Sequence, residues 1–411
     1  MKRLVMLMTL LITVLSIAPV TAQEKSNIQV QKLADNIYEL TATYPFSSNM
    51  VASVGEDGIL LVDAGTKYTA EELKSLVKTL GNGQVKFIIY THAHNEHIGG
   101  NIAFGGDVVR IGHESLRTRM KSGAYLLEEY SDTALPSITL TDSLSLFFNG
   151  EKIRLIAVPG AHDDGDIIVH FTKSGVVSTG AMSTGMHFPS TDGNGGNALK
   201  YPATVQRVIE LLPADVILVP GHGRTTTMAE ERQFQNMLAQ TIDIVRNGLT
   251  GGKDVATLQN DKVLKDWDSF GGGFVTADQW IQYIANGLNN VKPPKAAAVE
   301  LYIAYKKSNI DSAVAKWYEL RKNNPDDYSF GEGQFVVIGY YLLGMGKTRD
   351  AIKIFELYVK EFPKAWNAYD CLGEAYMNDG QKDLAIKNYK KSLKLNPQNT
   401  SAVDMLKKLE P

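Results

Sequence analysis

The chain has 411 residues, which is too many for one ordinary hydrophobic core and predicts two or three domains. Hydrophobic residues make up 44% and charged residues 21%, as is ordinary for a globular protein. The formal net charge of -3 gives no basic field of the kind that draws a protein to nucleic acid, so no nucleic-acid partner is expected.

The first 22 residues have the three-part pattern of a secretory signal peptide. Lys2 and Arg3 give a positive start, residues 4–20 are almost wholly apolar, and small residues up to Ala22 offer a cleavage point. The alternative is an uncleaved membrane anchor, but the apolar run is short of the roughly 20 residues that a span needs. We therefore expect an exported protein, periplasmic or secreted, with no stable membrane span after cleavage.

Short strand-like segments dominate the chain up to residue 180. Apolar or alternating runs predict strands at residues 37–43, 50–54, 58–63, 85–90, 108–112, 144–148, 153–158, 167–171 and 176–178. One helix, which starts after Thr69 and ends at Leu80, interrupts them. Many short strands with few helices indicate a pair of packed sheets.

Helices become more frequent after residue 200. Thr227 and Glu230 have the spacing of a capping box at the start of a long helix. A polar stretch with three consecutive glycines at residues 271–273 precedes the last helix of this part. The pattern predicts helices at residues 204–212, from 228 to about 247 and ending near 288, with a strand at 216–219.

Residues 291–295 predict a linker, and the chain beyond it is helical in pattern and repeats itself. Five pairs of like residues are 34 positions apart: Gly339 and Gly373, Gly346 and Gly380, Ala351 and Ala385, Phe355 and Tyr389, Pro363 and Pro397. This is the period of the tetratricopeptide repeat. We predict a tetratricopeptide-like domain over residues 295–411, with a looser first unit and a closing helix at residues 401–409. Its only cysteine, Cys371, is expected to be structural.

Histidines are concentrated directly after the predicted strand 85–90. His92 and His94 point the same way because side chains two apart on a strand share a side, so both can reach one ion. Glu96 and His97 begin the next segment and face the same cleft. Imidazole nitrogens suit the tetrahedral preference of Zn²⁺, so this cluster predicts a zinc site rather than a surface histidine cluster.

Two distant histidines, His162 and His222, each follow a predicted strand and lie in a turn that contains glycine. Alone, each would be interpreted as a structural turn residue. Together with the first cluster they are predicted metal ligands.

Residues 37–223 resemble the metallo-β-lactamase superfamily, whose hallmark is H-x-H-x-D-H, a His in a second turn, a bridging Asp and a final His. The resemblance implies an α+β chain in which residues 23–291 form an αββα sandwich with its site at one edge. It implies two ligand sets: His92, His94 and His162 for a first metal, and position 96, His97 and His222 for a second. It also implies that Asp63 supports the ligands without binding the metal.

Two positions depart from the family pattern. Glu96 replaces the aspartate, and its extra methylene matters because metal distances tolerate only about ±0.2 Å. Either the backbone adjusts, or Glu96 is a base or hydrogen-bond partner instead of a ligand. Ala181 stands where the bridging aspartate is expected, and Asp163, Asp164 and Asp192 are left as candidates to compensate. One zinc is therefore expected, and a second ion stays open.

Three functions remain open from the sequence. The one we expect is a zinc-dependent hydrolase, in which water activated by the metal attacks an ester, amide, lactone or β-lactam of a small-molecule substrate, with Glu96 and Asp63 as catalytic residues. The second is a degenerate metal site whose repeats bind a protein or peptide or mediate self-association. The third, a single-iron oxidoreductase, is disfavoured by an all-histidine first site.

Overall fold

The computed structural model describes residues 26–43, 47–81, 83–122, 130–191, 195–291, 295–325 and 327–410. The predicted signal peptide, Asp192 and the middle of the predicted linker lie outside these residues. The signal peptide and the domain boundary at the linker therefore stay predictions. None of the helices in the described ranges is long and apolar enough to cross a membrane.

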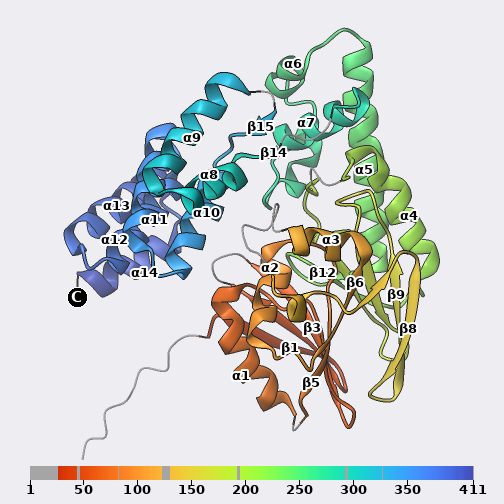
Figure 1. Cartoon of the computed structure of the whole chain (residues 1–411). Helices are drawn as coiled ribbons and strands as arrows, with labels where there is room; N and C mark the ends of the chain where they lie inside the picture. The colour runs from red at the N-terminus through yellow and green to blue at the C-terminus, as the bar shows by residue number, and fades with distance from the viewer. Residues whose placement is uncertain are drawn as a thin grey trace, which may run out of the picture.

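Two sheets pack face to face in the first part of the chain (Figure 1). The first has seven strands in chain order: β1 (Ile28–Ala34), β2 (Ile37–Ala42), β3 (Ser48–Gly55), β4 (Gly58–Val62), β5 (Val85–Ile89), β6 (Val109–His113) and β7 (Ile138–Leu140). The second has six, in the order β13 (Thr226–Thr227), β12 (Ile217–Pro220), β11 (Val176–Gly180), β10 (Ile167–Phe171), β9 (Glu151–Ala157) and β8 (Ser143–Phe148).

Strand β4 shows how the alternation of side chains builds three layers at once. Leu60 and Val62 join the core between the two sheets, whereas Ile59 and Leu61 point the other way and pack with Leu73 of α1. Neighbouring β4, β5, β6 and β7 run parallel, as is usual for strands that are buried on both faces.

Helices cover the outer face of each sheet. Those of the first sheet are α1 (Ala70–Leu80), α2 (Asn95–Ile98) and α3 (Glu114–Ser122); those of the second are α4 (Tyr201–Leu211), α5 (Met228–Thr250), α6 (Val255–Asn260) and α7 (Ala277–Leu288). Short 3-10 turns join them: η1 (Lys67–Thr69), η2 (Gly99–Ala103), η3 (Asp132–Ala134), η4 (Ala198–Lys200) and η5 (Lys265–Phe270). Both Thr227 and Glu230 make the predicted capping box of α5. The predicted αββα sandwich is confirmed.

The sequence analysis missed several short elements, among them β1 and α3. Strand β1 is an edge strand in which Gln29, Val30 and Gln31 are all exposed, so it lacks the alternation that identifies a half-buried strand.

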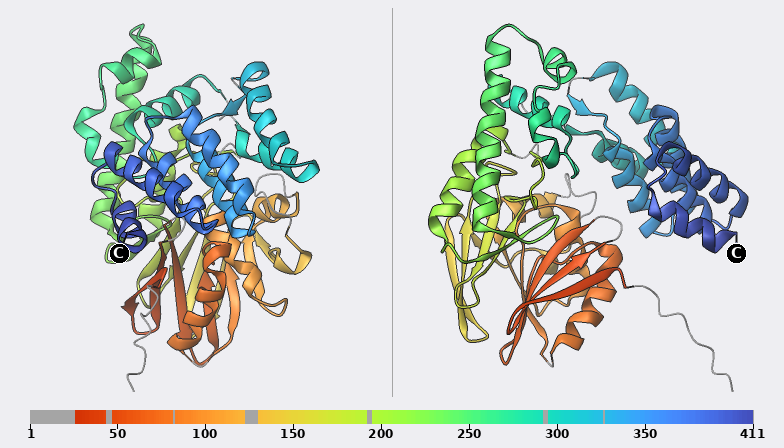
Figure 2. Two further views of the ribbon diagram at one scale, coloured as in Figure 1. Left: turned by 90° about the vertical axis from the view of Figure 1, so that its left-hand side faces the viewer. Right: turned by 180° about the vertical axis from the view of Figure 1, so that it is seen from behind.

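Seven helices make up the rest of the described chain and form the predicted helical repeats: α8 (Ala297–Lys307), α9 (Ile310–Asn323), α10 (Gly333–Gly344), α11 (Thr348–Glu361), α12 (Trp366–Asn378), α13 (Lys382–Leu395) and α14 (Thr400–Leu409). Figure 2 shows these helices stacked in an array beside the sandwich. A short parallel pair, β14 (Lys295–Ala296) with β15 (Tyr328–Ser329), lies at the start of the array. Cys371 is a buried free cysteine within it, as expected.

The 34-residue period corresponds to a packing contact that occurs twice. Gly339 faces the ring of Phe355, and Gly373 faces the ring of Tyr389, each on the first helix of a pair against the second. A Cβ at Gly339 would lie 2.3 Å from Cε1 of Phe355, and one at Gly373 would lie 3.0 Å from Cδ1 of Tyr389. Glycine recurs because the helices approach too closely for a side chain.

This contact predicts a graded loss of stability. Gly339→Ala should lower the free energy of unfolding by about 1–3 kcal/mol, because the methyl group overpacks the helix pair. Gly373→Ala should cost less, since its ring has a shorter distance to move. Gly333→Ala, at a position with no atom within 4 Å of the added Cβ, is the control. Denaturant unfolding followed by circular dichroism measures all three; a Gly339→Ala protein as stable as the control would contradict this packing.

Candidate metal centre

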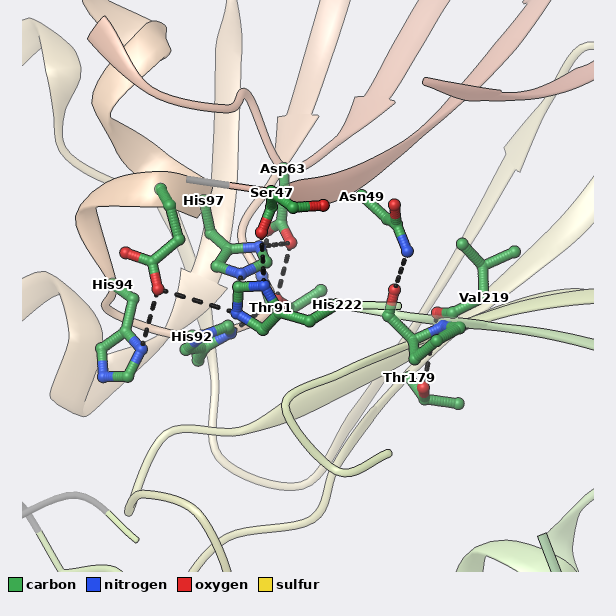
Figure 3. Close-up of polar contacts among 12 residues, drawn as sticks. Ser47, Asn49, Asp63, Thr91, His92, His94, His97, Thr179, Val219 and His222 are labelled. Carbon is green, nitrogen blue, oxygen red and sulfur yellow. Dashed lines mark hydrogen bonds and ion pairs between the residues drawn. The ribbon is translucent and has the colours of Figure 1, made fainter. Parts of the chain in front are cut away.

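Five histidines from four chain segments converge at one edge of the sandwich, and Figure 3 shows four of them, His92, His94, His97 and His222. His92 and His94 follow β5, His97 lies on α2, His162 follows β9, and His222 follows β12. Three groups of nearby side chains could hold a metal ion: His92 with His94 and His162; Asp63 with His92 and His97; and Glu96 with His97 and His222. Within each group the ligand atoms lie within 4.8 Å of one another.

Four of these rings are held through the same nitrogen. Nδ1 lies 2.9 Å from Thr91 Oγ1 in His92, 2.9 Å from Asp63 Oδ2 in His97, 3.1 Å from the Ser190 carbonyl in His162 and 2.6 Å from the Ser47 carbonyl in His222. The carboxylate and carbonyl oxygens only accept, so Nδ1 donates to them. Thr91 donates its own hydroxyl proton to Asp63, so its oxygen accepts from His92. When neutral, each ring therefore keeps the lone pair on Nε2 for another partner.

The arrangement of the Nε2 atoms fits a cation. His92 is fully buried, and no hydrogen-bond partner for its Nε2 exists among the described residues. Nε2 of His97 and Nε2 of His222 lie 3.3 Å apart. Two neutral rings anchored as above would bring two lone pairs together there, whereas two nitrogens on one tetrahedral zinc are also separated by about 3.3 Å. The donor set therefore fits zinc.

The electrostatics of the site keep these rings in the metal-binding form. Burial, together with the neighbouring His97 and His94, lowers the pKa of His92 well below its ordinary value. Burial and the neighbouring His97 also lower the pKa of His222 to about 4, against the opposite effect of Glu96. Both rings are thus neutral at pH 7, as a metal ligand must be.

Glu96 lies in the same cavity with its carboxylate ionised. Burial raises its pKa, but the hydrogen bond from His94 and the electrostatic interactions with the surrounding imidazoles outweigh burial and leave the pKa well below 4.5. Its Oε1 lies 3.5 Å from Nδ1 of His94 and 3.7 Å from Nε2 of His222. The carboxylate of Glu96 is therefore an acceptor beside both candidate ion positions.

Asp63 connects the first sheet to the histidines. Strand β4 ends at Val62, and Asp63 adopts a left-handed conformation with φ of 61° that aspartate tolerates better than most residues. Its carboxylate accepts from the backbone and hydroxyl of Thr91, each at 2.8 Å, and from His97. Sequence reasoning named Asp63 but missed Thr91, which joins Asp63 to His92.

The turn that carries His222 is fixed across the two sheets. The side-chain amide of Asn49 on β3 donates to the carbonyls of Pro220 and Gly223 at 2.9 and 2.7 Å. A Cβ at Gly221 would lie 3.0 Å from Cε1 of His97, so glycine allows the turn to reach the other histidines. Sequence reasoning missed Asn49, because nothing in the local pattern of a strand indicates a partner 171 residues away.

A cavity of about 520 Å³ opens beside the histidines. Its lining comes from both sheets, from the glycine-rich segment and from the repeat helices: Ser47, His94, Glu96, His162, Ala181, Thr184, His187, Phe188, Ser190, His222, Gly223, Gly272, Gly273, Phe274, Val275 and Val337. Ala181 presents a methyl group to this cavity. The sequence analysis missed His187, Phe274 and Val337, and only Phe274 had a local signal, its position after three glycines.

Two of the aspartates considered as substitutes for the bridging ligand have another role. Asp163 forms an ion pair with Arg119 at 2.7 Å and accepts from the backbone of Gly165, while Asp164 binds the same guanidinium. Neither belongs to a candidate ligand group in the part of the chain that the structure describes. The compensation considered for Asp163 and Asp164 is therefore not supported, because an arginine binds both carboxylates.

A buried carboxyl lies behind the cavity wall. Glu231 on α5 accepts a hydrogen bond of 2.9 Å from Ser183, two residues beyond Ala181. Burial raises the pKa of Glu231 from 4.5 to about 7, although the Ser183 hydrogen bond opposes the shift. The folded chain therefore binds this proton more tightly than the unfolded chain does.

Glu231 should make stability fall as the pH rises from about 4.5 to about 7, because over this range the carboxyl is ionised in the unfolded chain and must take up a proton when the chain folds. Glu231→Gln should remove this dependence on pH. The free energy of unfolding of the variant should exceed that of the wild type at pH 8, by at most roughly 3 kcal/mol, and should differ little at pH 4. The hydrogen bond from Arg224 lowers the pKa of the neighbouring Glu230 to about 2. Glu230→Gln should therefore lower the free energy of unfolding at pH 8. Denaturant unfolding at both pH values is the measurement; parallel pH profiles for wild type and Glu231→Gln would be inconsistent with a buried, neutral carboxyl.

Comparison with known proteins identifies both parts of the chain. Residues 43–222 match the family model of the metallo-beta-lactamase superfamily, and residues 338–365 and 366–399 match models of the tetratricopeptide repeat. The predicted resemblance of the first part of the chain to this superfamily and the predicted repeats are thus confirmed.

Similar proteins include two described as metallo-beta-lactamase type 2. The one from Bacteroides fragilis is 24% identical over 232 residues, 54% of this chain and 90% of that protein. The one from Bacillus sp. (strain 170) is 22% identical over 236 residues, 55% of this chain and 86% of that protein. Tetratricopeptide repeat protein 37 of Xenopus laevis is 28% identical over 93 residues, 23% of this chain and 5% of that protein.

Solved structures with a similar chain path include a metallo-beta-lactamase from Pontibacter korlensis. It has a TM-score of 0.46 at 19% identity and covers 52% of this chain and 99% of that one. A metallo-beta-lactamase from Hirschia baltica has a TM-score of 0.44 at 18% identity, and the match covers 51% of this chain and 97% of that one.

Proposed function

We propose that this chain, whose residues 43–222 form a metallo-β-lactamase superfamily domain followed by tetratricopeptide repeats, is an exported zinc-dependent hydrolase of a small ester, amide, lactone or β-lactam. The observation that carries the proposal is the convergence of His92, His94 and His162 on one point, with the buried Nε2 of His92 directed there. Surface histidines without a role would not be anchored through Nδ1 in this way.

His92, His94 and His162 would hold the ion. A zinc ion in that place supplies a nucleophile at neutral pH, by lowering the pKa of water towards about 7, and polarises the substrate oxygen. These three histidines would supply the protein ligands of a catalytic zinc ion, which typically has three. A second ion would be held by Glu96, His97 and His222, and the position of Ala181 removes the carboxylate that would join the two sites.

The protein side chains supply orientation and proton transfer. Thr91 and the Ser190 carbonyl fix the rings of His92 and His162. If one ion is bound, Glu96 Oε1 remains free of metal and accepts the proton from the attacking water. The oxygen of that water forms a bond to the carbonyl carbon, the C–O or C–N bond breaks, and the departing oxygen or nitrogen takes a proton back from Glu96.

Metal dependence tests the proposal directly. Purified protein should contain about one zinc per chain, hydrolyse at least one member of a panel of nitrocefin, lactones and esters, and lose that activity with a chelator. Replacing one ligand should have the same effect, so His162→Ala should lose both zinc and activity. His170→Ala, a buried histidine outside the cavity, is the matched control. Elemental analysis and the activity assay are the measurements.

Two results would count against this function. Hydrolysis that survives chelation would exclude a metal mechanism. A protein that binds no metal at micromolar zinc would favour the degenerate site with a binding role for the repeats.

Ala181 gives a test of the second ion position. Ala181→Asp should raise the zinc content towards two per chain, because it adds a carboxylate to the wall shared with Glu96 and His222. Ala181→Asn, of the same size without the charge, should raise it less. Unchanged zinc content in Ala181→Asp, measured by elemental analysis after dialysis against zinc, would show that the two ligand groups are not bridged from this position.

A further inference from the structure

Part of the lining of the cavity beside the histidines lies outside residues 43–222, the segment that matches the superfamily model. Phe274, Val275 and Val337 line it together with His94 and His222. Phe274 and Val275 come from the segment before α7, and Val337 comes from α10 of the repeat domain. A repeat helix and a metal-binding edge therefore share one cavity.

The three consecutive glycines explain how Phe274 reaches this place. A Cβ at Gly273 would lie 2.8 Å from Cβ of His187, so only glycine lets the backbone pass over that ring. The chain then places the ring of Phe274 edge-on to His222, with 5.1 Å between the ring centroids. Phe274 remains 64% exposed, so its ring is accessible to a molecule in the cavity.

Helix α10 is held against the sandwich by three contacts with η1, which starts four residues after Asp63 (Figure 1). The hydroxyl of Tyr68 donates to the carbonyl of Tyr340 at 2.5 Å. The ammonium of Lys67 lies 3.4 Å from the centroid of the Tyr341 ring, within the range of a cation–π interaction. The ring of Tyr68 lies against Gly344, where a Cβ would be 1.6 Å from its Cε1.

These contacts decide where Val337 lies. Tyr340, Tyr341 and Gly344 are on the same helix as Val337, one or two turns further along. Holding them against η1 fixes the distance of Val337 from the metal-binding edge. The side chain of Val337 is 39% exposed, so apolar surface remains available in the cavity.

We propose that the repeat domain forms part of the substrate-binding site, where Val337, Phe274 and Val275 make an apolar wall that receives an aliphatic or aromatic group next to the hydrolysed bond. This inference rests on the proposed hydrolase function and narrows its substrate class. The histidines bind the polar end of the substrate, and the wall selects the apolar end. The repeats thus act on small-molecule specificity through α10.

A series of p-nitrophenyl esters from acetate to hexanoate tests the wall on the zinc-loaded full chain. In the wild type, kcat/KM should rise with each added methylene, by up to about fourfold. Val337→Asp should flatten this rise, because a charged side chain replaces apolar surface in the wall. Leu384→Asp is the control, because Leu384 on α13 is 37% exposed and lies outside the cavity.

A second pair of variants tests the position of α10 without replacing any residue that lines the cavity. Gly344→Ala forces a methyl group into the ring of Tyr68 and should flatten the chain-length dependence as Val337→Asp does. Gly333→Ala, at the other end of α10 in open space, should leave it unchanged. Circular dichroism on all four proteins checks that each is folded.

Calorimetric binding of octanoate and acetate separates this inference from the proposed function. If no member of the panel of nitrocefin, lactones and esters is hydrolysed in a chelator-sensitive way, the hydrolase proposal fails, and the binding data alone decide whether the apolar wall binds an aliphatic group. The wall is supported if the wild type binds octanoate at least tenfold more tightly than acetate and Val337→Asp no longer shows this difference. Equal binding of the two acids, or a chain-length dependence identical in Val337→Asp, Gly344→Ala and their controls, overturns it.

Discussion

The arrangement depends on one hydrogen-bonded chain that fixes imidazole rings from the side away from the cavity. Asp63 accepts from Thr91 and from His97, and Thr91 accepts from His92. The bonds from His97 and His92 occupy Nδ1 of each ring and leave its Nε2 available to the site. Burial lowers the pKa values of His92 and His222, so these two rings stay neutral and their lone pairs are available to a cation at pH 7.

The two sheets hold the rings in an arrangement that is unfavourable without a cation. A buried ring nitrogen without a partner, and two ring nitrogens 3.3 Å apart, are unfavourable unless a cation binds them. The strands hold them in place none the less: β4 ends at Asp63, β5 leads to His92, and Asn49 on β3 fixes the turn of His222. Rigid strands with short loops thus preorganise the site before any ion is bound.

The second domain is coupled to this site through a small set of contacts. Tyr68 and Lys67 lie on η1, close in sequence to Asp63, and both contact α10. The same helix presents Val337 to the cavity. Helix α10 packs with α11 in one continuous core, so the residue that lines the cavity belongs to the repeat array itself.

The sequence by itself determined much of the fold and the main ligand candidates. The strands from β2 to β6 and from β8 to β12, the capping box of α5 and the 34-residue repeat were all predicted, because alternation, capping and periodicity are local properties. The histidine spacing and the glycine turns identified all five rings. Short or polar elements such as β1 and α3 were missed, since their patterns are too weak to identify.

Tertiary structure alone decided what surrounds those residues. Asn49 and Pro220 meet across 171 positions, and Thr91 acquires its role only because Asp63 arrives beside it. Asp163 and Asp164, which the sequence left as substitutes for the position of Ala181, turn out to bind Arg119. Val337 reaches a cavity formed more than 100 residues earlier in the chain. Contacts of this kind leave no local periodicity, because they arise from the packing of whole sheets and helices and not from the pattern of any one segment.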